Sequence, residues 1–215
     1  MMNNNNKVMV NGVVKGKAKF DHEVLGEKFY TVLVGVKRRS GVEDNVPVLV
    51  SERLWDVNTD HSGERVAVEG EFRSKNMSVD GKSRVLLKVF AKKICEEPQG
   101  AVENDENQIV MNGYICKQPS YRMTPLGREI CDVMLAVNRG NGKSDYIPCI
   151  VWGRNAKYMA DRKVGEQFCI SGRIQSREYT KMTEEMSEIR IAYEVSVQKI
   201  EAGKEVTETE EDFEL

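Results

Sequence analysis

An internal repeat is the feature that most constrains the fold of this 215-residue chain. When the sequence is slid along itself, matching residues recur at an offset of 101 or 102 positions over nearly the whole chain. The matches include Asn11-Gly12 with Asn112-Gly113, Val46-Pro47 with Ile147-Pro148, and Gly70 with Gly172. Each copy spans about 90 residues, which is far longer than a solenoid repeat. The repeat therefore predicts two homologous domains in tandem.

Within each copy, the hydrophobic pattern is typical of β-strands. Partly alternating, β-rich segments cover 128–138, 145–152, 167–175 and 189–200, with turn residues such as Gly140-Asn141-Gly142 between them. We expect four or five strands per copy and a short helix before the fourth, at 155–162 in the second copy and at 52–57, behind Ser51, in the first. Pro47 and Pro148 predict an edge or a bulge, because proline cannot donate to a strand ladder.

Five strands with a short helix between the third and fourth is the order of an OB-fold, a small Greek-key barrel. On the pattern alone, a generic small barrel or an SH3-like domain fits equally well. The expected fold class is all-β: two tandem OB-fold domains, each with a short helix, and a disordered acidic tail. The expected boundaries are a first domain at 7–95, an acidic linker at 96–107, a second domain at 108–200 and the tail at 201–215.

The charged residues are distributed unevenly along the chain. The formal net charge is −2, but residues 7–95 carry 17 basic and 12 acidic side chains, and residues 108–200 carry 14 and 10. Segment 96–107 has five acids and no base, and segment 201–215 has seven acids against Lys204. This asymmetry favours a polyanion-binding body with acidic appendages. The tail is too charged to pack against a core.

The remaining composition narrows the class of protein. The five cysteines form an odd set without a C-x-x-C pair, which favours reduced thiols and a cytoplasmic, nucleoid-associated protein. The sequence has no apolar run of 18 residues and no signal peptide. His22 and His61 lie far apart, so we expect no metal and no cofactor. No phosphate loop, nucleophile elbow or H-E-x-x-H motif is present, so we do not expect an enzyme.

The second copy contains a string of spaced motifs. They are Asn112-Gly113-Tyr114, Pro125-Leu126-Gly127, Ala136-Val137-Asn138-Arg139, Asp145-Tyr146, Val151-Trp152-Gly153-Arg154 and Ile170-Ser171-Gly172-Arg173. Over about 110–180 this string resembles the bacterial single-stranded DNA-binding protein (SSB) family, and the first copy resembles it only through the second. The resemblance implies OB barrels in the two-domain form of the family, which dimerises to present four OB domains. We therefore expect a homodimer.

The resemblance also implies residues that stack on bases. These would be Tyr146 and Trp152 in the third strand and Tyr179 in the loop between the fourth and fifth strands. Aromatic rings stack on unpaired bases for about 1–3 kcal/mol each without reading sequence. The alternative is packing, because Tyr146 and Trp152 are six residues apart and would share a face inside a barrel as well as outside it.

Basic side chains lie between these aromatic residues and are candidates for phosphate binding. In the second copy they are Arg122, Arg128, Arg139, Lys143, Arg154, Arg173 and Arg177. In the first copy they are Lys37, Arg38, Arg39, Arg73 and Lys75. The first copy has Asn45, Ser51 and Met77 where the second has its aromatic residues, so we expect it to bind DNA more weakly or to serve assembly.

The expected function is to coat and protect single-stranded DNA during replication, recombination or repair. The tail ends in Asp212-Phe213-Glu214-Leu215, which resembles the acidic tip through which the family recruits replication and repair proteins. It lacks the usual proline and terminal phenylalanine, and a tail that nothing recognises is the alternative. Two other functions stay open: an adaptor of a replication or mobile-element system with weak nucleic-acid binding, and an RNA-binding protein.

Overall fold

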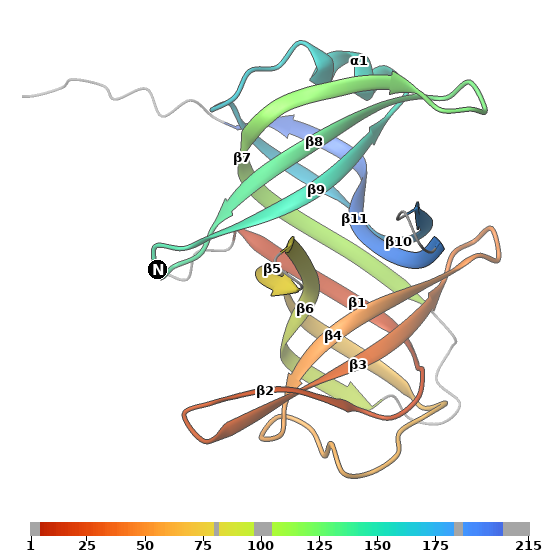
Figure 1. Cartoon of the computed structure of the whole chain (residues 1–215), viewed down its shortest axis with the longest axis vertical. Helices are drawn as coiled ribbons and strands as arrows, with labels where there is room; N and C mark the ends of the chain where they lie inside the picture. The colour runs from red at the N-terminus through yellow and green to blue at the C-terminus, as the bar shows by residue number, and fades with distance from the viewer. Residues whose placement is uncertain (1–4, 80–81, 97–104, 183–186, 204–215) are drawn as a thin grey trace, which may run out of the picture.

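The computed structural model describes residues 5–79, 82–96, 105–182 and 187–203, which form two stacked β-barrels (Figure 1). The strands of the first domain are β1 (Asn6–Val14), β2 (Lys19–Val24), β3 (Glu27–Lys37), β4 (Glu43–Ser51), β5 (Arg65–Val79) and β6 (Lys82–Glu96). The second domain consists of β7 (Glu106–Met123), β8 (Glu129–Asn138), β9 (Ser144–Trp152), helix α1 (Arg154–Ala160), β10 (Gln167–Met182) and β11 (Ser187–Ala202). The predicted all-β fold of two OB barrels is confirmed. Strand β2 makes six strands in the first domain, one more than expected.

Each barrel closes through a short parallel pairing next to its repeated proline. In the first domain Val48 and Leu49 of β4 pair with β6, and in the second Cys149 and Ile150 of β9 pair with β11. Pro47 and Pro148 lie immediately before these pairings. Up to the proline, each of these strands is hydrogen-bonded to a neighbour on one side only. A residue without an N–H donor is therefore tolerated there.

The repeated glycines Gly70 and Gly172 lie at equivalent β-bulges. The register of β5 on β6 shifts between Glu69 and Gly70, and that of β10 on β11 shifts between Ser171 and Gly172. A Cβ atom at Gly172 would lie 2.2 Å from the carbonyl oxygen of Ser196, and one at Gly70 would lie 2.3 Å from that of Phe90. Both positions therefore require glycine for the close approach of two backbones.

The prediction of a helix at 52–57 in the first domain is wrong. That segment forms turns in which Ser51 accepts a hydrogen bond on its carbonyl oxygen from Leu54 N–H (2.9 Å) and on Oγ from Arg53 N–H (3.1 Å). The Asp56 carboxylate then accepts hydrogen bonds from Asn58 N–H and Thr59 Oγ1. These side-chain acceptors compete with helical hydrogen bonds, so the segment turns where the second domain continues into α1.

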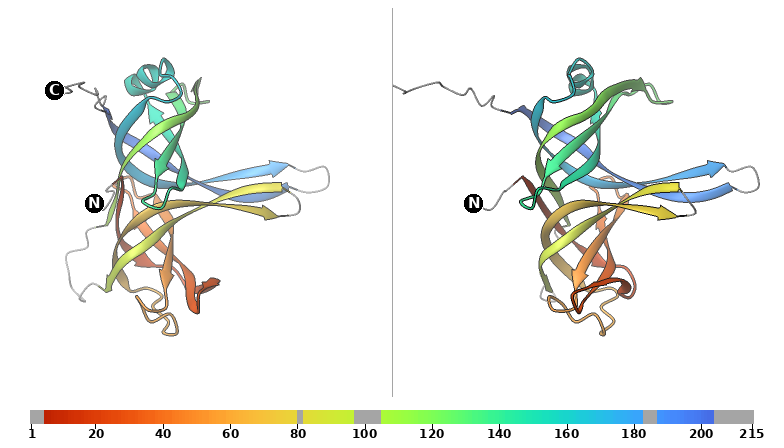
Figure 2. Two further views of the ribbon diagram at one scale, coloured as in Figure 1. Left: turned by 90° about the vertical axis from the view of Figure 1, so that its left-hand side faces the viewer. Right: turned by 60° about the vertical axis from the view of Figure 1, so that its left-hand side comes forward.

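The two barrels share one sheet. Strand β1 pairs antiparallel with β7, which joins all eleven strands of the described residues in the order β10-β11-β9-β8-β7-β1-β5-β6-β4-β3-β2. In this pairing Val8 lies opposite Ile109, its own counterpart in the repeat. Antiparallel strands that meet at equivalent residues are related by a twofold axis, so the two domains have local twofold symmetry. The hairpins β5–β6 and β10–β11 consequently project side by side from one side of the molecule (Figure 2).

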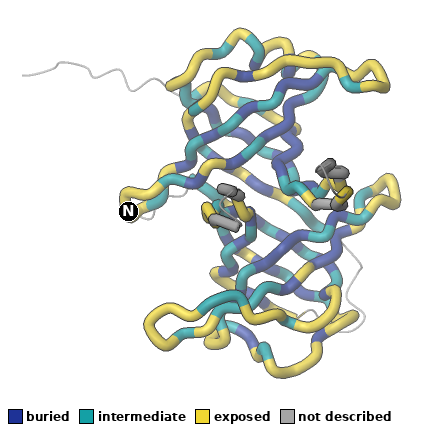
Figure 3. Tube along the Cα trace, in the orientation of Figure 1, coloured by how far each residue is buried: buried dark blue, intermediate teal, exposed yellow. Residues whose placement is uncertain are grey.

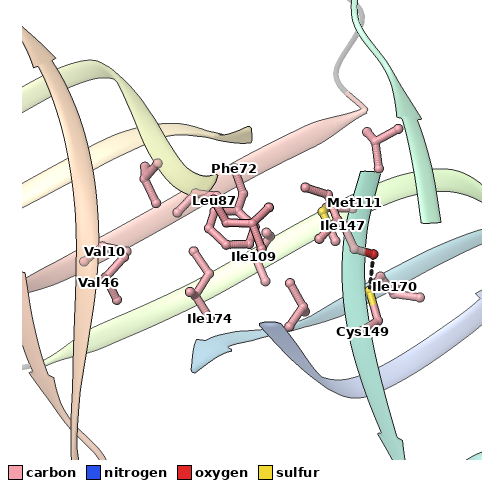
Figure 4. Close-up of a cluster of buried hydrophobic side chains, with 14 of the residues drawn as sticks. Val10, Val46, Phe72, Leu87, Ile109, Met111, Ile147, Cys149, Ile170 and Ile174 are labelled. Carbon is pink, nitrogen blue, oxygen red and sulfur yellow. Dashed lines mark hydrogen bonds between the residues drawn. The ribbon is translucent and has the colours of Figure 1, made fainter. Parts of the chain in front are cut away.

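The hydrophobic core continues from one barrel into the other. Buried residues follow the inner faces of both barrels and the strands between them (Figure 3). Phe72 and Val10 of the first domain belong to the same cluster as Ile109, Met111 and Ile174 of the second (Figure 4). The sequence repeat predicts two domains but not this shared core, and nothing in either copy alone indicates which strand pairs across the junction.

The cysteines are free thiols. Cys131 and Cys149 are buried, and Cys95 is exposed. Burial raises the pKa of Cys131 to about 11 and also raises that of Cys149, so both are protonated at neutral pH. No helix in the described part of the chain combines the length and apolar character that crossing a membrane requires.

Candidate nucleic-acid interface

Strand β9 places the two predicted stacking residues on its outer face. Tyr146 is 48% exposed and Trp152 is half-buried, whereas Ile147 and Val151 point into the core. The barrel-core alternative is therefore wrong for Tyr146. The Trp152 indole N–H donates a hydrogen bond to Ser196 Oγ at 3.1 Å, which fixes the edge of its ring against β11.

Tyr179 lies in a strand and not in a loop, contrary to the sequence prediction. It is part of β10 and is paired with Arg190 of β11. The two strands stay paired from Phe168 and Ala202 out to Met182 and Ser187, because the hairpin extends beyond the barrel as a two-stranded ribbon (Figure 2). The side chain of Tyr179 lies outside the described part of the structure, so its stacking role stays a prediction.

A basic groove runs along the boundary between the two domains. It consists of two adjoining cavities of about 440 and 600 Å³ that share Arg38 and Arg173. We call it the junction groove. The first cavity is also lined by Trp152. The other predicted basic residues that line the groove are Arg128 and Arg177 from the second domain and Lys37 and Arg39 from the first. The structure thus brings seven of the predicted site residues together, from both copies of the repeat.

Buried carboxylates hold the strands that carry this groove. Asp44 is 1% exposed and accepts hydrogen bonds from Arg38 Nε and Nη2, both at 2.6 Å, and from the backbone N–H of Ser176 across the junction at 3.2 Å. Hydrogen bonding to Asp44 raises the pKa of Arg38. The carboxylate therefore links β4 of the first domain to β10 of the second.

The twofold symmetry repeats this link on the other side. Asp145 is also 1% exposed and accepts hydrogen bonds from Arg139 Nε at 2.7 Å and from Ser74 N–H at 2.6 Å. Arg139 Nη2 also donates to the Ser74 carbonyl oxygen at 3.0 Å. Of two predicted DNA contacts, Arg139 therefore bonds across the junction directly, whereas Arg38 bonds only to Asp44 of its own domain. Their roles in DNA binding stay predictions.

The other predicted site residues lie outside the junction groove. Arg73 pairs with Glu71 (2.7 Å), and Arg122 pairs with Asp132 (2.6 Å). Arg154 is exposed at the start of α1. Lys75 and Lys143 line a cavity on the opposite side of the local axis. Tyr146 lines an apolar cavity of about 450 Å³ between the domains, so it does not share a cavity with Trp152. The tail residues Asp212, Phe213, Glu214 and Leu215 lie outside the described residues.

Sequence reasoning missed the residues that assemble the junction. Asp44 of the first copy is equivalent in the repeat to Asp145 of the second, and Ser74 is equivalent to Ser176. A search of the repeat for shared polar residues within apolar strands would have found them, because a polar residue in such a position needs a buried partner.

One histidine cluster lies at the far end of the first barrel. His61 is buried and stacks on Trp55 with ring centroids 4.1 Å apart. Its Nδ1 is 2.6 Å from Glu64 Oε2 and 3.6 Å from Glu96 Oε1, and its Nε2 is 2.9 Å from the Asp56 carbonyl oxygen. Acceptors on both ring nitrogens are the environment of a protonated imidazole, which donates from both nitrogens.

Comparison with known proteins agrees with this geometry. Residues 106–202, which cover the second domain, match the model of the "Single-strand binding protein family". The second domain is therefore similar in sequence to the members of that family. A "Single-stranded DNA-binding protein 2" of Listeria innocua is 38% identical over 80 residues, which are 34% of this chain and 50% of that protein. The "Single-stranded DNA-binding protein A" of Bacillus subtilis is 36% identical over 80 residues, which are 34% and 46% of the two chains. The chain spans about half the length of the curated relatives it matches.

The fold similarity covers both domains. A crystal structure of a deletion mutant of the single-stranded DNA-binding protein from Thermus aquaticus aligns with a TM-score of 0.72 over 96% of this chain and 98% of that one. The two sequences are 19% identical, so this likeness concerns the fold alone. The first domain therefore shares the barrel fold of the second.

Proposed function

We propose that this protein binds single-stranded DNA without strong sequence preference and protects it during replication, recombination or repair. The observation that carries the proposal is the junction groove, where Trp152 lies beside Arg128, Arg173 and Arg177. An aromatic ring among arginines suits a strand with unpaired bases, since the ring stacks on bases while the guanidinium groups bind phosphates. Tyr179 would extend the stacking surface beyond the groove. Tyr146 lines the apolar cavity between the domains, so it would stack on a base only where that cavity is open to DNA and not covered by a second copy.

The proposal extends to partners and place in the cell. The acidic tail ending in Leu215 would recruit replication or repair proteins, and a homodimer would present four OB domains to DNA. The free cysteines and the DNA ligand favour a cytoplasmic, nucleoid-associated protein. The proposed binding of DNA in the groove requires neither a cofactor nor a catalytic step.

A titration of labelled oligo-dT at two salt concentrations tests the proposal. Binding that neutralises phosphates weakens with salt, with a slope of the logarithm of affinity of about −0.7 per phosphate for single strands. We expect tight binding that weakens steeply between about 50 and 200 mM salt, with a matched duplex and an RNA of the same length competing poorly. A flat response to salt contradicts the proposal, and equal competition by RNA points to the RNA-binding alternative.

The adaptor alternative rests on the apolar cavity between the domains, which is suited to protein contacts. Weak or unselective binding of oligo-dT by a folded chain would favour it. In that case the partners of the first domain and of the tail are the next targets.

A further inference from the structure

The local twofold axis generates a second groove that is related to the junction groove. It also consists of two cavities, of about 320 and 380 Å³, which share Arg73 and Arg139. We call it the related groove. Arg139 and Asp145 take the places here that Arg38 and Asp44 take in the junction groove. By symmetry alone, the chain would have two equivalent tracks for a strand of DNA.

The two grooves differ at several equivalent positions, and one of these lies at the centre. Val8 pairs with Gly70, and its counterpart Ile109 pairs with Gly172, so the repeat register is fixed at these glycines. The next residue is Glu71 in the first domain and Arg173 in the second. The exchange of an acid for a base changes the local charge by two at the centre of the groove.

In the related groove, Glu71 binds the cations that would otherwise bind phosphate. Its carboxylate accepts hydrogen bonds from Arg73 Nε at 3.0 Å and Nη2 at 2.7 Å, and it also pairs with Lys92. Burial by itself raises the pKa of Glu71, but the hydrogen bonds from Lys92 and Arg73 outweigh it and lower the pKa. Glu71 is therefore ionised at neutral pH and repels a phosphate.

Two further interactions occupy the rest of the related groove. The Arg73 guanidinium lies 3.9 Å from the centroid of the Phe90 ring, so this aromatic face is covered. Lys88 pairs with Asp21. The cations of the groove that form no ion pair within the described residues are Lys75 and Lys143.

In the junction groove, a base and not an acid occupies the position equivalent to Glu71. Arg38 and Arg173 share a single carboxylate, because Asp44 is 2.6 Å from Arg38 and 3.9 Å from Arg173 Nε. Arg173 Nε is buried and has no hydrogen-bond partner within the described residues. Burial and the charge of Arg38 lower the pKa of Arg173, as expected for two guanidinium groups with one counter-charge. An anion bound beside them would neutralise the second guanidinium.

We propose that the chain uses its two related grooves unequally: the junction groove binds single-stranded DNA, with a phosphate at Arg38 and Arg173, while Glu71 keeps DNA out of the related groove. The track is shared by both domains, since Lys37 and Arg39 extend it onto the first domain. The inference rests on the proposed DNA-binding function and assigns its path.

A charge exchange between the two grooves tests the inference in the full-length chain. Glu71→Arg should open the related groove and increase both the affinity for long oligo-dT and the number of nucleotides covered per chain. The matched control is Glu69→Arg, which makes the same charge change on the same strand at a residue that lines neither groove. A gain in Glu71→Arg that exceeds the gain in Glu69→Arg supports the inference, and equal gains overturn it.

A second variant removes charge from the junction groove without touching a buried residue. Lys37 and Arg39 are both exposed, so the double variant Lys37→Ala/Arg39→Ala should fold normally. Its salt slope for oligo-dT should be smaller by about 0.7 for each cation removed. The control is Lys117→Ala/Lys163→Ala, which removes two exposed lysines from the second domain outside both grooves. Equal slopes for the two double variants overturn the inference. If the wild-type chain does not bind oligo-dT at all, the proposed function itself fails.

Discussion

Trp152 is the residue whose contribution to binding can be separated most directly. The chain has two tryptophans, and Trp55 is buried at the far end of the first barrel. Trp152→Ala should reduce the affinity for oligo-dT by about 1–3 kcal/mol, the contribution of one stacked base. Trp152→Phe keeps a ring and should lose less. Equilibrium titration with labelled oligo-dT measures both, and equal affinities for wild type and Trp152→Ala would refute stacking at this residue.

Fluorescence gives an independent readout of the same residue. In the wild-type chain, DNA should quench the emission of Trp152 and leave that of Trp55 unchanged. The quenching should disappear in Trp152→Phe while Trp55 still reports that the first barrel is folded. Quenching that persists in Trp152→Phe would place the bound strand near Trp55 and not in the junction groove.

His61 predicts a pH dependence of stability. Burial by itself lowers the pKa of His61, but the hydrogen bonds to Glu64 and to the Asp56 carbonyl outweigh it and raise the pKa. A raised pKa contributes stability that is complete below the unfolded value of about 6.5 and is lost as the pH rises through the folded value. The free energy of unfolding should therefore fall as the pH rises from about 6.5 through the raised pKa of the folded state.

The comparison of two histidine variants tests this effect. Urea unfolding of His61→Gln should show a weaker dependence on pH in this window. His22→Gln should keep the wild-type dependence, because it leaves the contact between His61 and Glu64 intact. An unchanged pH profile in His61→Gln would mean that other groups cause the effect.

At the level of strands, the bulges set the shape of both barrels. Gly172→Ala would place a Cβ atom 2.2 Å from the Ser196 carbonyl oxygen. Overpacking of this kind costs about 1–3 kcal/mol, and neither backbone can move without breaking the pairing of β10 with β11. Gly140→Ala is the matched control, since a Cβ atom there would meet nothing within 4 Å. Thermal unfolding should show a lower Tm for Gly172→Ala than for wild type and an unchanged Tm for Gly140→Ala. Equal Tm values for the two variants would mean that the bulge tolerates a side chain.

The strands show how far the sequence predicts this structure. The repeat, the turn residues and the prolines predict two barrels, because these signals are local. The helix at 52–57 was predicted wrongly because the side chain of Asp56 forms its own hydrogen bonds with the backbone. The hairpin that contains Tyr179 is longer than expected, since its outer part pairs only with itself and leaves no hydrophobic period to detect.

The candidate site depends on contacts that no single copy of the repeat contains. Motifs predicted Trp152 and the arginines of the junction groove one by one. Their assembly depends on the pairing of β1 with β7 and on Asp44 and Asp145, which join residues about 70 to 130 positions apart. The repeat shows equivalent positions, and only the twofold arrangement shows that Glu71 and Arg173 occupy equivalent grooves.

At the scale of the whole molecule, an apolar cavity with a partly exposed rim lies between the two domains, on their local twofold axis. Leu33 and its counterpart Met134, and Pro47 and its counterpart Pro148, line the same cavity between the domains. Ile191 is also part of this cavity and is 51% exposed. Exposed apolar residues gathered at a symmetry axis suit contact with a second copy, because a twofold interface joins the same patch on both partners. This face supports the proposed homodimer.

A substitution on this face tests the dimer. Leu33→Glu/Ile191→Glu adds charges to the centre of the proposed interface and should convert a dimer into a monomer in sedimentation analysis. Leu126→Glu is the control, because Leu126 is exposed in the turn between β7 and β8 and lies outside the cavity. Dimerisation through this face would leave both junction grooves free, so the monomeric variant should bind short oligo-dT as tightly as wild type but lose affinity for long oligo-dT. A wild-type chain that sediments as a monomer at micromolar concentration would contradict the dimer and leave the grooves of a single chain to account for binding.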